Sequence, residues 1–129
     1  MTLPAQQTVS TTAKPDIVVI MVDDLDYNLA MGLIEGDANG SHLPLEDTVL
    51  IFTSDNGYFH GEHRLSRKVI PYEEALRIPL MMRVPGISGG QVITQPVLMN
   101  DLAPTILELA DVSPPASWEF DGRSLVPLL

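Results

Sequence analysis

Two acidic or amide pairs, each placed directly after an apolar run, carry the first sign of chemistry in this sequence. Asp23 and Asp24 follow IVVIMV, and Asp55 and Asn56 follow VLIFTS. Ligands of parallel sheets collect outside the carboxyl ends of the strands, so neighbouring strands would bring three carboxylates and one amide together. These oxygen donors suit a hard cation such as Ca²⁺ or Mg²⁺ better than zinc. Either pair alone is better explained as the cap of a turn.

A cationic cluster follows the second pair and favours the metal interpretation. Three of the seven Lys and Arg residues lie within five positions: Arg64, Arg67 and Lys68. Gly57 and Gly61 allow the chain to bend and to return Lys68 over the cation. A metal and a lysine together can clamp a sulfuryl or phosphoryl group, although lysine is usually a solvated surface charge. His60 and His63 could be general acids or anion donors, and a packing or solvent-facing role explains each of them as well.

The overall composition limits the classes of partner. The 129 residues carry a formal charge of −10, which argues against nucleic acid as a general partner because phosphate backbones are bound through Lys and Arg. The absence of cysteine excludes disulfides, zinc–thiolate sites and a cysteine nucleophile. Residues 1–14 are polar, without the apolar core of a signal peptide, and we expect a disordered tail there. IVVIMV is too short to span a membrane.

The predicted elements alternate between strands and helices. Continuous apolar runs predict strands at 17–22, 48–54 and 79–84, with a short one possible at 91–94, and the first is expected to be buried on both faces. Helical spacing or a helix-compatible proline predicts helices at 25–35, 71–77 and 100–111, the last capped by Asn100 or Asp101. We therefore expect one α/β domain over 15–129, a mostly parallel sheet flanked by helices.

Several longer motifs carry a family resemblance. PDIVVIMVDDLDY resembles the amino-terminal signature of the sulfatases, within the alkaline-phosphatase-like superfamily. TVLIFTSDNGYFHGEHRLSRKVIPYEEALRIPLMMRVPG is similar to their later segment, with the second metal pair, the GEH turn and the sulfate-binding lysine. NDLAPTILELADV and DGRSLVPLL resemble the end of their main domain. The chain looks nearest to the enzymes that act on N-acetylglucosamine 6-sulfate and related sulfated sugars.

The resemblance implies a partial alkaline-phosphatase-like core and assigns roles residue by residue. The metal ligands would be Asp23, Asp24, Asp55 and Asn56, and the ion would be Ca²⁺, with Mg²⁺ as the alternative. Lys68 would bind a sulfate oxygen, and His63 is a second candidate for contact with the substrate, a sulfated sugar or an aryl sulfate ester. Members of this family are often exported or lysosomal.

The sequence departs from the family at the nucleophile. Sulfatases use a formylglycine made from the first residue of a C-x-P-S-R motif, sometimes with Ser in place of Cys, and neither form occurs in these 129 residues. Only thirty residues separate Asp24 from Asp55, far fewer than in the family. The resemblance thus implies a large internal deletion between Met31 and Pro44 and a missing smaller domain after Leu129. Because the formylglycine is itself a metal ligand, the site is short of donors, and weak Ca²⁺ binding is expected.

Three functional hypotheses follow. The first is a sulfatase-like domain that keeps part of the metal site and the sulfate-binding lysine but does not turn substrate over. The second is a weak metal-dependent sulfate or phosphate ester hydrolase that uses metal-bound water, which Ca²⁺ activates poorly. The third is a non-enzymatic module that binds a metal, an anion or another protein. The missing nucleophile favours the first.

Overall fold

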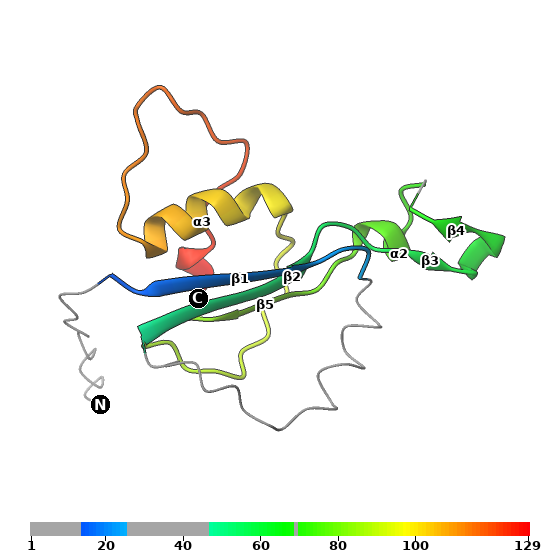
Figure 1. Cartoon of the computed structure of the whole chain (residues 1–129), viewed down its shortest axis with the longest axis horizontal. Helices are drawn as coiled ribbons and strands as arrows, with labels where there is room; N and C mark the ends of the chain where they lie inside the picture. The colour runs from blue at the N-terminus through cyan, green and yellow to red at the C-terminus, as the bar shows by residue number, and fades with distance from the viewer. Residues whose placement is uncertain (1–13, 26–46, 69) are drawn as a thin grey trace, which may run out of the picture.

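A three-stranded sheet lies at the centre of the computed structural model, which describes residues 14–25, 47–68 and 70–129 (Figure 1). Its strands are β1 (Asp16–Val22), β2 (Thr48–Ser54) and β5 (Leu80–Arg83), in the spatial order β1-β2-β5. β1 and β2 are parallel, with Val22 opposite Ser54, whereas β5 runs antiparallel to β2. The α/β class is confirmed, and the described part of the sheet is mixed, with one parallel and one antiparallel pairing.

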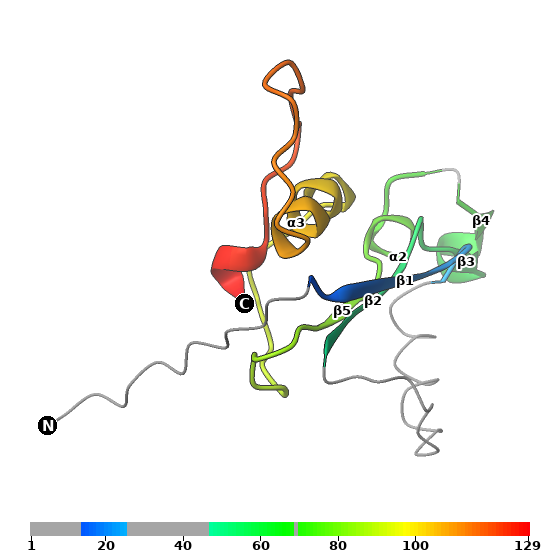
Figure 2. The same ribbon diagram turned by 60° about the vertical axis from the view of Figure 1, so that its left-hand side comes forward.

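The carboxy-terminal part of the chain covers one face of this sheet. The helix α3 (Leu102–Leu109) lies across that face, preceded by the short helix η3 (Met99–Asp101) (Figure 2). The last turn, η4 (Val126–Leu128), packs beside it. The buried core consists of the central strand, the start of α3 and the residue before η4: Val49, Ile51, Leu102 and Leu125. Central position explains the burial of β2, because both of its edges are paired.

The predicted helix at 100–111 is confirmed by η3 and α3 together. Pro104 lies in the first turn of α3, where its missing N–H costs no hydrogen bond. Thr105 is fully buried, and its hydroxyl donates to the carbonyl of Asp101 at 2.6 Å. The described residues contain no helix with the length and hydropathy of a membrane span.

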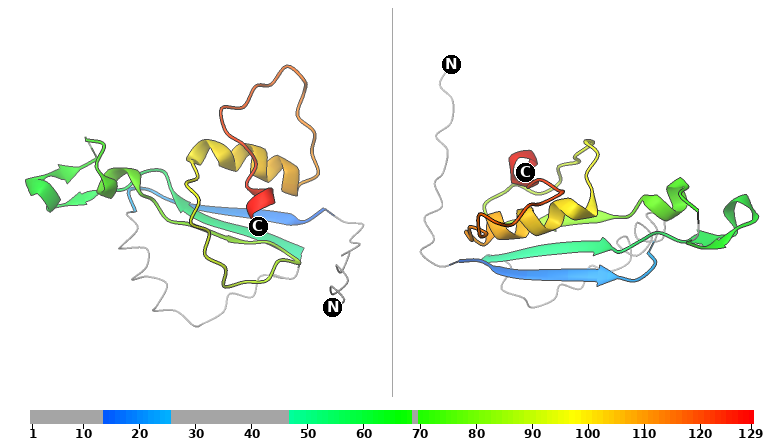
Figure 3. Two further views of the ribbon diagram at one scale, coloured as in Figure 1. Left: turned by 180° about the vertical axis from the view of Figure 1, so that it is seen from behind. Right: turned by 90° about the horizontal axis from the view of Figure 1, so that it is seen from above.

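A second, smaller unit projects from the sheet end toward which β1 and β2 point (Figure 3). It is a hairpin of β3 (Phe59–His60) and β4 (Ser66–Arg67), with the turn η2 (Glu62–Arg64) between them. The helix α2 (Glu73–Leu76) follows and lies between the hairpin and the sheet (Figure 1). The helix predicted at 71–77 is therefore present in a shorter form, beginning two residues after Pro71.

Some sequence-based expectations differ from the structure. The strand predicted at 17–22 forms, but Val19, Ile20 and Met21 are 41%, 43% and 52% exposed, so the prediction of burial on both faces is wrong. β1 is an outer strand of the described sheet, and only one of its faces looks toward α3. Residues 91–94 form no strand; Val92 is 88% exposed, and no described strand pairs there. The predicted helix at 25–35 and the tail up to residue 13 lie outside the described residues, apart from Leu25.

Candidate metal and anion site

The two acidic pairs meet at one end of the sheet. Asp23 and Asp24 directly follow β1, and Asp55 directly follows β2. Because these strands are parallel neighbours in exact register, their carboxyl ends lie side by side. One carboxylate oxygen from each of the three aspartates lies within 4.8 Å of the others. The predicted convergence is confirmed for the three aspartates, and it depends on the direct β1–β2 pairing. The role of Asn56 as a fourth ligand stays a prediction.

Ser54 holds these two strand ends together, and sequence reasoning missed it. The residue is fully buried, and its hydroxyl accepts a hydrogen bond from the backbone N–H of Leu25 at 2.9 Å. The same oxygen lies 2.8 Å from the carbonyl of Val22 and 2.7 Å from that of Asn56, and one of these carbonyls takes its proton. The only available signal was the position of a small polar residue directly before the second pair.

The backbone at Asp24 also connects the pairs. Asp24 has a positive φ of 57°, a conformation that Asp tolerates better than most residues. Its N–H donates to Oδ1 of Asp55 at 3.1 Å. This hydrogen bond is the main cause that holds the pKa of Asp55 below its ordinary value of 3.8, and the positive charge of Lys68 adds to it. The structure therefore favours the charged form of Asp55.

Lys68 lies over the three carboxylates and contacts each of them. Its Nζ is 3.3 Å from Asp23 Oδ1 and 3.5 Å from Asp55 Oδ2, and it forms a closer ion pair with Asp24 Oδ1. The contact with Asp24, followed by that with Asp23, raises the pKa of Lys68. The Lys68 side chain is 41% exposed, so solvent screens these pairs and each contributes little to stability.

Asn56 and Gly57 join the end of β2 to α2. The side-chain amide of Asn56 donates from Nδ2 to the carbonyl of Gly57 at 2.7 Å, and Gly57 N–H donates to the carbonyl of Ala75 at 3.0 Å. A Cβ atom at Gly57 would collide with the carbonyl oxygen of Glu74. This close approach requires glycine. Thus α2 packs directly against the segment that carries Asp55 and Asn56.

His60 and His63 lie in the hairpin and contact other groups. His63 stacks on Tyr72 with ring centroids 4.6 Å apart, and its Nε2 is 3.3 Å from Glu74 Oε1. The buried ring of Phe59 packs edge-on against His63, at a centroid distance of 6.4 Å. His60 lies beside Tyr58, with a centroid distance of 5.0 Å. These contacts tie η2 to α2, and the sulfate-binding role of His63 stays a prediction.

The donor set fits a divalent cation. Ca²⁺ binds oxygen at about 2.3–2.6 Å, so two oxygens on opposite sides of one ion lie roughly 5 Å apart. The 4.8 Å limit within which the oxygens of Asp23, Asp24 and Asp55 fall is compatible with that span. Asp24 Oδ1 is buried and accepts no hydrogen bond of good geometry from the described residues, although it pairs with the Lys68 charge. The cluster could therefore hold a metal ion.

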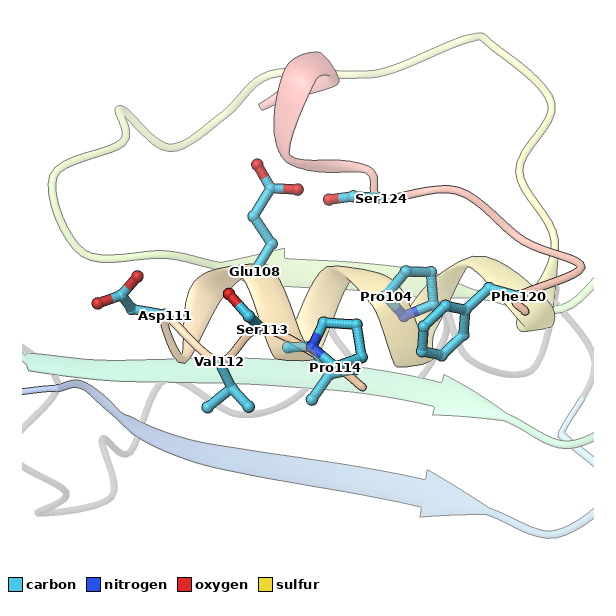
Figure 4. A pocket seen from close by; sticks show the side chains of 9 residues that line it. Pro104, Glu108, Asp111, Val112, Ser113, Pro114, Phe120 and Ser124 are labelled. Carbon is cyan, nitrogen blue, oxygen red and sulfur yellow. The ribbon is translucent and has the colours of Figure 1, made fainter. Parts of the chain in front are cut away.

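A separate hollow lies beside α3. It has a volume of about 350 Å³ and is lined by residues of α3 and of the loop after it, among them Pro104, Glu108 and Phe120 (Figure 4). None of the predicted site residues lines it. The candidate site is thus the exposed edge at the strand ends, distinct from this hollow.

Several known proteins are similar to this chain over about two thirds of its length. The chain is 42% identical over 86 residues to the extracellular sulfatase SULF-1 homolog of Drosophila melanogaster, covering 66% of this chain and 8% of that protein. It is 40% identical over 86 residues to an N-acetylglucosamine-6-O-sulfatase of Bacteroides thetaiotaomicron, covering 66% and 15%. It is 39% identical over 85 residues to arylsulfatase K of Danio rerio, covering 66% and 16%. The chain therefore spans less than a fifth of the length of these relatives.

A solved structure matches the fold as well. The structure of BT4656 in complex with its substrate, D-glucosamine-2-N,6-O-disulfate, superposes with a TM-score of 0.59 at 39% sequence identity, covering 65% of this chain and 17% of that one. The sulfatase family model matches residues 41–112, more than half of the chain and including the second acidic pair and Lys68. With the sequence, the strand-end geometry and the fold in agreement, this chain belongs to the sulfatase family.

Proposed function

We propose that this chain binds a divalent cation, Ca²⁺ or less favourably Mg²⁺, at Asp23, Asp24, Asp55 and Asn56. Beside the cation, Lys68 binds the sulfate group of a sulfated sugar or aryl sulfate. One observation carries the proposal: three carboxylates from two strands converge within 4.8 Å, and the lysine ammonium lies against all three. Oxygen donors of this kind favour hard cations.

In this proposal the acidic residues hold the cation, and the cation and Lys68 together contact the sulfate group. A bound cation supplies positive charge that attracts and polarises a sulfate oxygen. Lys68 adds a second positive charge on a flexible stem, which suits a group with several oxygens. His63, held against Tyr72 and Glu74, is proposed as a further sulfate contact. The names of the Bacteroides thetaiotaomicron relative and of the BT4656 ligand support a sulfated amino sugar as the substrate class.

In this proposal the 129 residues bind a sulfate ester but do not hydrolyse it efficiently. Sulfate ester hydrolysis in this family needs an activated nucleophile in line with the leaving group, and no C-x-P-S-R or S-x-P-S-R motif is present. Charge stabilisation alone leaves a reaction several orders of magnitude slower.

Thermal melting tests the cation site. Because an ion that binds only the folded chain stabilises it by mass action, Ca²⁺ at ten times its dissociation constant should raise the melting temperature by about 5 °C over chelator. Asp55→Ala should abolish the rise. Asp16→Ala, which removes the same charge from the other end of β1, should retain it. Equal melting with Ca²⁺ and with chelator in the unmodified chain rejects the cation site.

An aryl sulfate assay tests the second half of the proposal. We expect no release of the aryl alcohol above background in Ca²⁺, while inorganic sulfate still binds and Lys68→Ala weakens that binding. Turnover that scales with protein concentration and disappears in Lys68→Ala would support the weak hydrolase instead.

A further inference from the structure

Lys68 places a positive charge where the proposed divalent cation would need its ligands. Its Nζ lies 3.3 Å from Asp23 Oδ1 and 3.5 Å from Asp55 Oδ2, and Asp24 Oδ1 is closer still. We propose that Lys68 is a tethered counter-cation that a divalent ion displaces from the carboxylates, so that metal binding releases the ammonium to meet a sulfate group. This inference rests on the proposed function and adds an order to its two binding steps.

The Lys68 ammonium and the proposed divalent ion compete for the three carboxylates, for reasons of both space and charge. A divalent ion would be held by the carboxylate oxygens of Asp23, Asp24 and Asp55, which bind such ions at about 2.3–2.6 Å. The ammonium contacts one oxygen of each of these residues, so an ion among the same oxygens would lie close to it and the two positive charges would repel. Three carboxylates against one ammonium leave this cluster with a net negative charge. The lysine thus partly neutralises the cluster and opposes the entry of a second cation.

The lysine is free enough to move. Its side chain is 41% exposed and stands on a flexible four-carbon stem directly after β4. Exposed ion pairs are weak, so water and salt can replace them at small cost. Asp24 and Asp55 are more firmly placed, since the Asp24 N–H is bonded to Asp55 and Ser54 ties both strand ends. We therefore expect the ammonium of Lys68, and not the carboxylates, to move when a divalent ion binds.

Displacement couples the cation to the anion. While Lys68 is paired with three carboxylates, an incoming sulfate must compete with them for the ammonium. Once the cation neutralises the carboxylates, the ammonium and the cation both attract the sulfate. Ca²⁺ should consequently tighten the binding of inorganic sulfate, and sulfate should tighten Ca²⁺ by the same factor.

Calorimetric titration with CaCl₂ tests the competition. Lys68→Met keeps the apolar stem and removes the competing charge, so it should bind Ca²⁺ about tenfold more tightly than the unmodified chain in low-salt buffer. Arg67→Met is the matched control: it removes one positive charge from the adjacent, exposed residue, which has no ion pair with the three carboxylates. Its Ca²⁺ affinity should change less than about twofold, because solvent screens the more distant charge.

The outcomes separate this inference from the cation site itself. Tighter Ca²⁺ binding in Lys68→Met alone supports the counter-cation. Equal or weaker binding in a folded Lys68→Met chain overturns it and leaves the cation site intact. An equal gain in Arg67→Met overturns it too, since general charge then explains the effect. No Ca²⁺ binding in any of the three proteins overturns the cation site and the inference together.

Acetylation of the unmodified chain provides a second test that needs no variant. The sequence contains two lysines, Lys14 and Lys68, and Lys14 donates to the backbone carbonyl of Asp111, far from the carboxylates in sequence. With acetic anhydride and mass spectrometry, Ca²⁺ should raise the modification rate of Lys68 several-fold while that of Lys14 stays constant. An unchanged Lys68 rate at saturating Ca²⁺ overturns the displacement.

Discussion

Ser54 shows how one small side chain can position a site without being a ligand. Its buried hydroxyl bridges Leu25, Val22 and Asn56, which belong to the two segments that carry the acidic pairs. Replacing it would leave buried backbone groups without a partner, and such groups cost more than a hydrogen bond contributes. The geometry of the candidate site therefore depends on a residue that offers no atom to the cation in our proposal.

Ser54→Ala should destabilise the fold and weaken the cation site. The N–H of Leu25 would lose its hydrogen-bond acceptor, so we expect the free energy of unfolding to fall by about 1–3 kcal/mol. Urea denaturation measures this change. Ser113→Ala, an exposed serine after α3, is the control and should change little. Equal stability of the two variants would show that the bridge contributes nothing.

At the scale of elements, the carboxy-terminal segment is held to α3 by two polar residues. The Asp101 carboxylate accepts hydrogen bonds from the N–H of Leu98 at 2.8 Å and of Arg123 at 2.9 Å. The Thr105 hydroxyl accepts from the N–H of Leu125 at 2.8 Å. Leu125 belongs to the core with Val49 and Ile51, so these bonds help to seat η4 on the sheet.

Thr105→Val tests this connection. Valine matches threonine in shape but cannot accept the hydrogen bond from Leu125, so a loss of about 1–3 kcal/mol in the free energy of unfolding is expected. Amide hydrogen exchange should show faster exchange at Leu125, with little change in the β3–β4 hairpin. Thr94→Val, in the exposed loop before α3, serves as the reference. If exchange at Leu125 is as slow as before, Thr105 does not anchor the segment.

The hairpin is an element whose backbone is strained where the chain must turn. His63, Arg64 and Arg67 have positive φ values of 53°, 61° and 75°, which cost free energy in residues other than glycine. The stack of His63 on Tyr72 and its pairing with Glu74 offset part of that cost. Since Lys68 follows β4 directly, the packing of the hairpin decides where the ammonium lies.

For the whole molecule, acidic pH should lower stability in a defined range. The pKa of Asp55 is held below 3.8 mainly by the Asp24 N–H, and that of Asp101 mainly by the N–H groups of Arg123 and Leu98. A depressed folded-state pKa contributes stability above the unfolded value near 3.8, and this is lost as pH falls through the folded values.

Urea denaturation between pH 6 and pH 2 in chelator measures this dependence. We expect a plateau above about pH 5 and a decline below about pH 4, because the folded and unfolded chains then bind different numbers of protons. Asp55→Asn and Asp101→Asn should each make the decline shallower. A decline of unchanged steepness in both variants would assign the acid sensitivity to other groups.

The local sequence by itself determined several features of this protein. The acidic pairs, the strands at 17–22 and 48–54, the helix at 100–111 and the sulfatase resemblance all follow from runs of neighbouring residues. Apolar runs and helical spacing act over a few residues, and family motifs are themselves contiguous. The convergence of the three aspartates could be predicted on the condition that the two strands are parallel neighbours, because such strands end at the same edge.

Tertiary structure alone decided which groups touch across long sequence separations. The bridge from Ser54 to Val22, the contact of Lys68 with three carboxylates and the antiparallel direction of β5 depend on how strands are paired. The exposure of Ile20 and Met21 depends likewise on which elements cover β1, since an apolar run has the same composition in a central strand and in an outer one. Pairing and coverage are properties of the assembled sheet, and no local pattern encodes them.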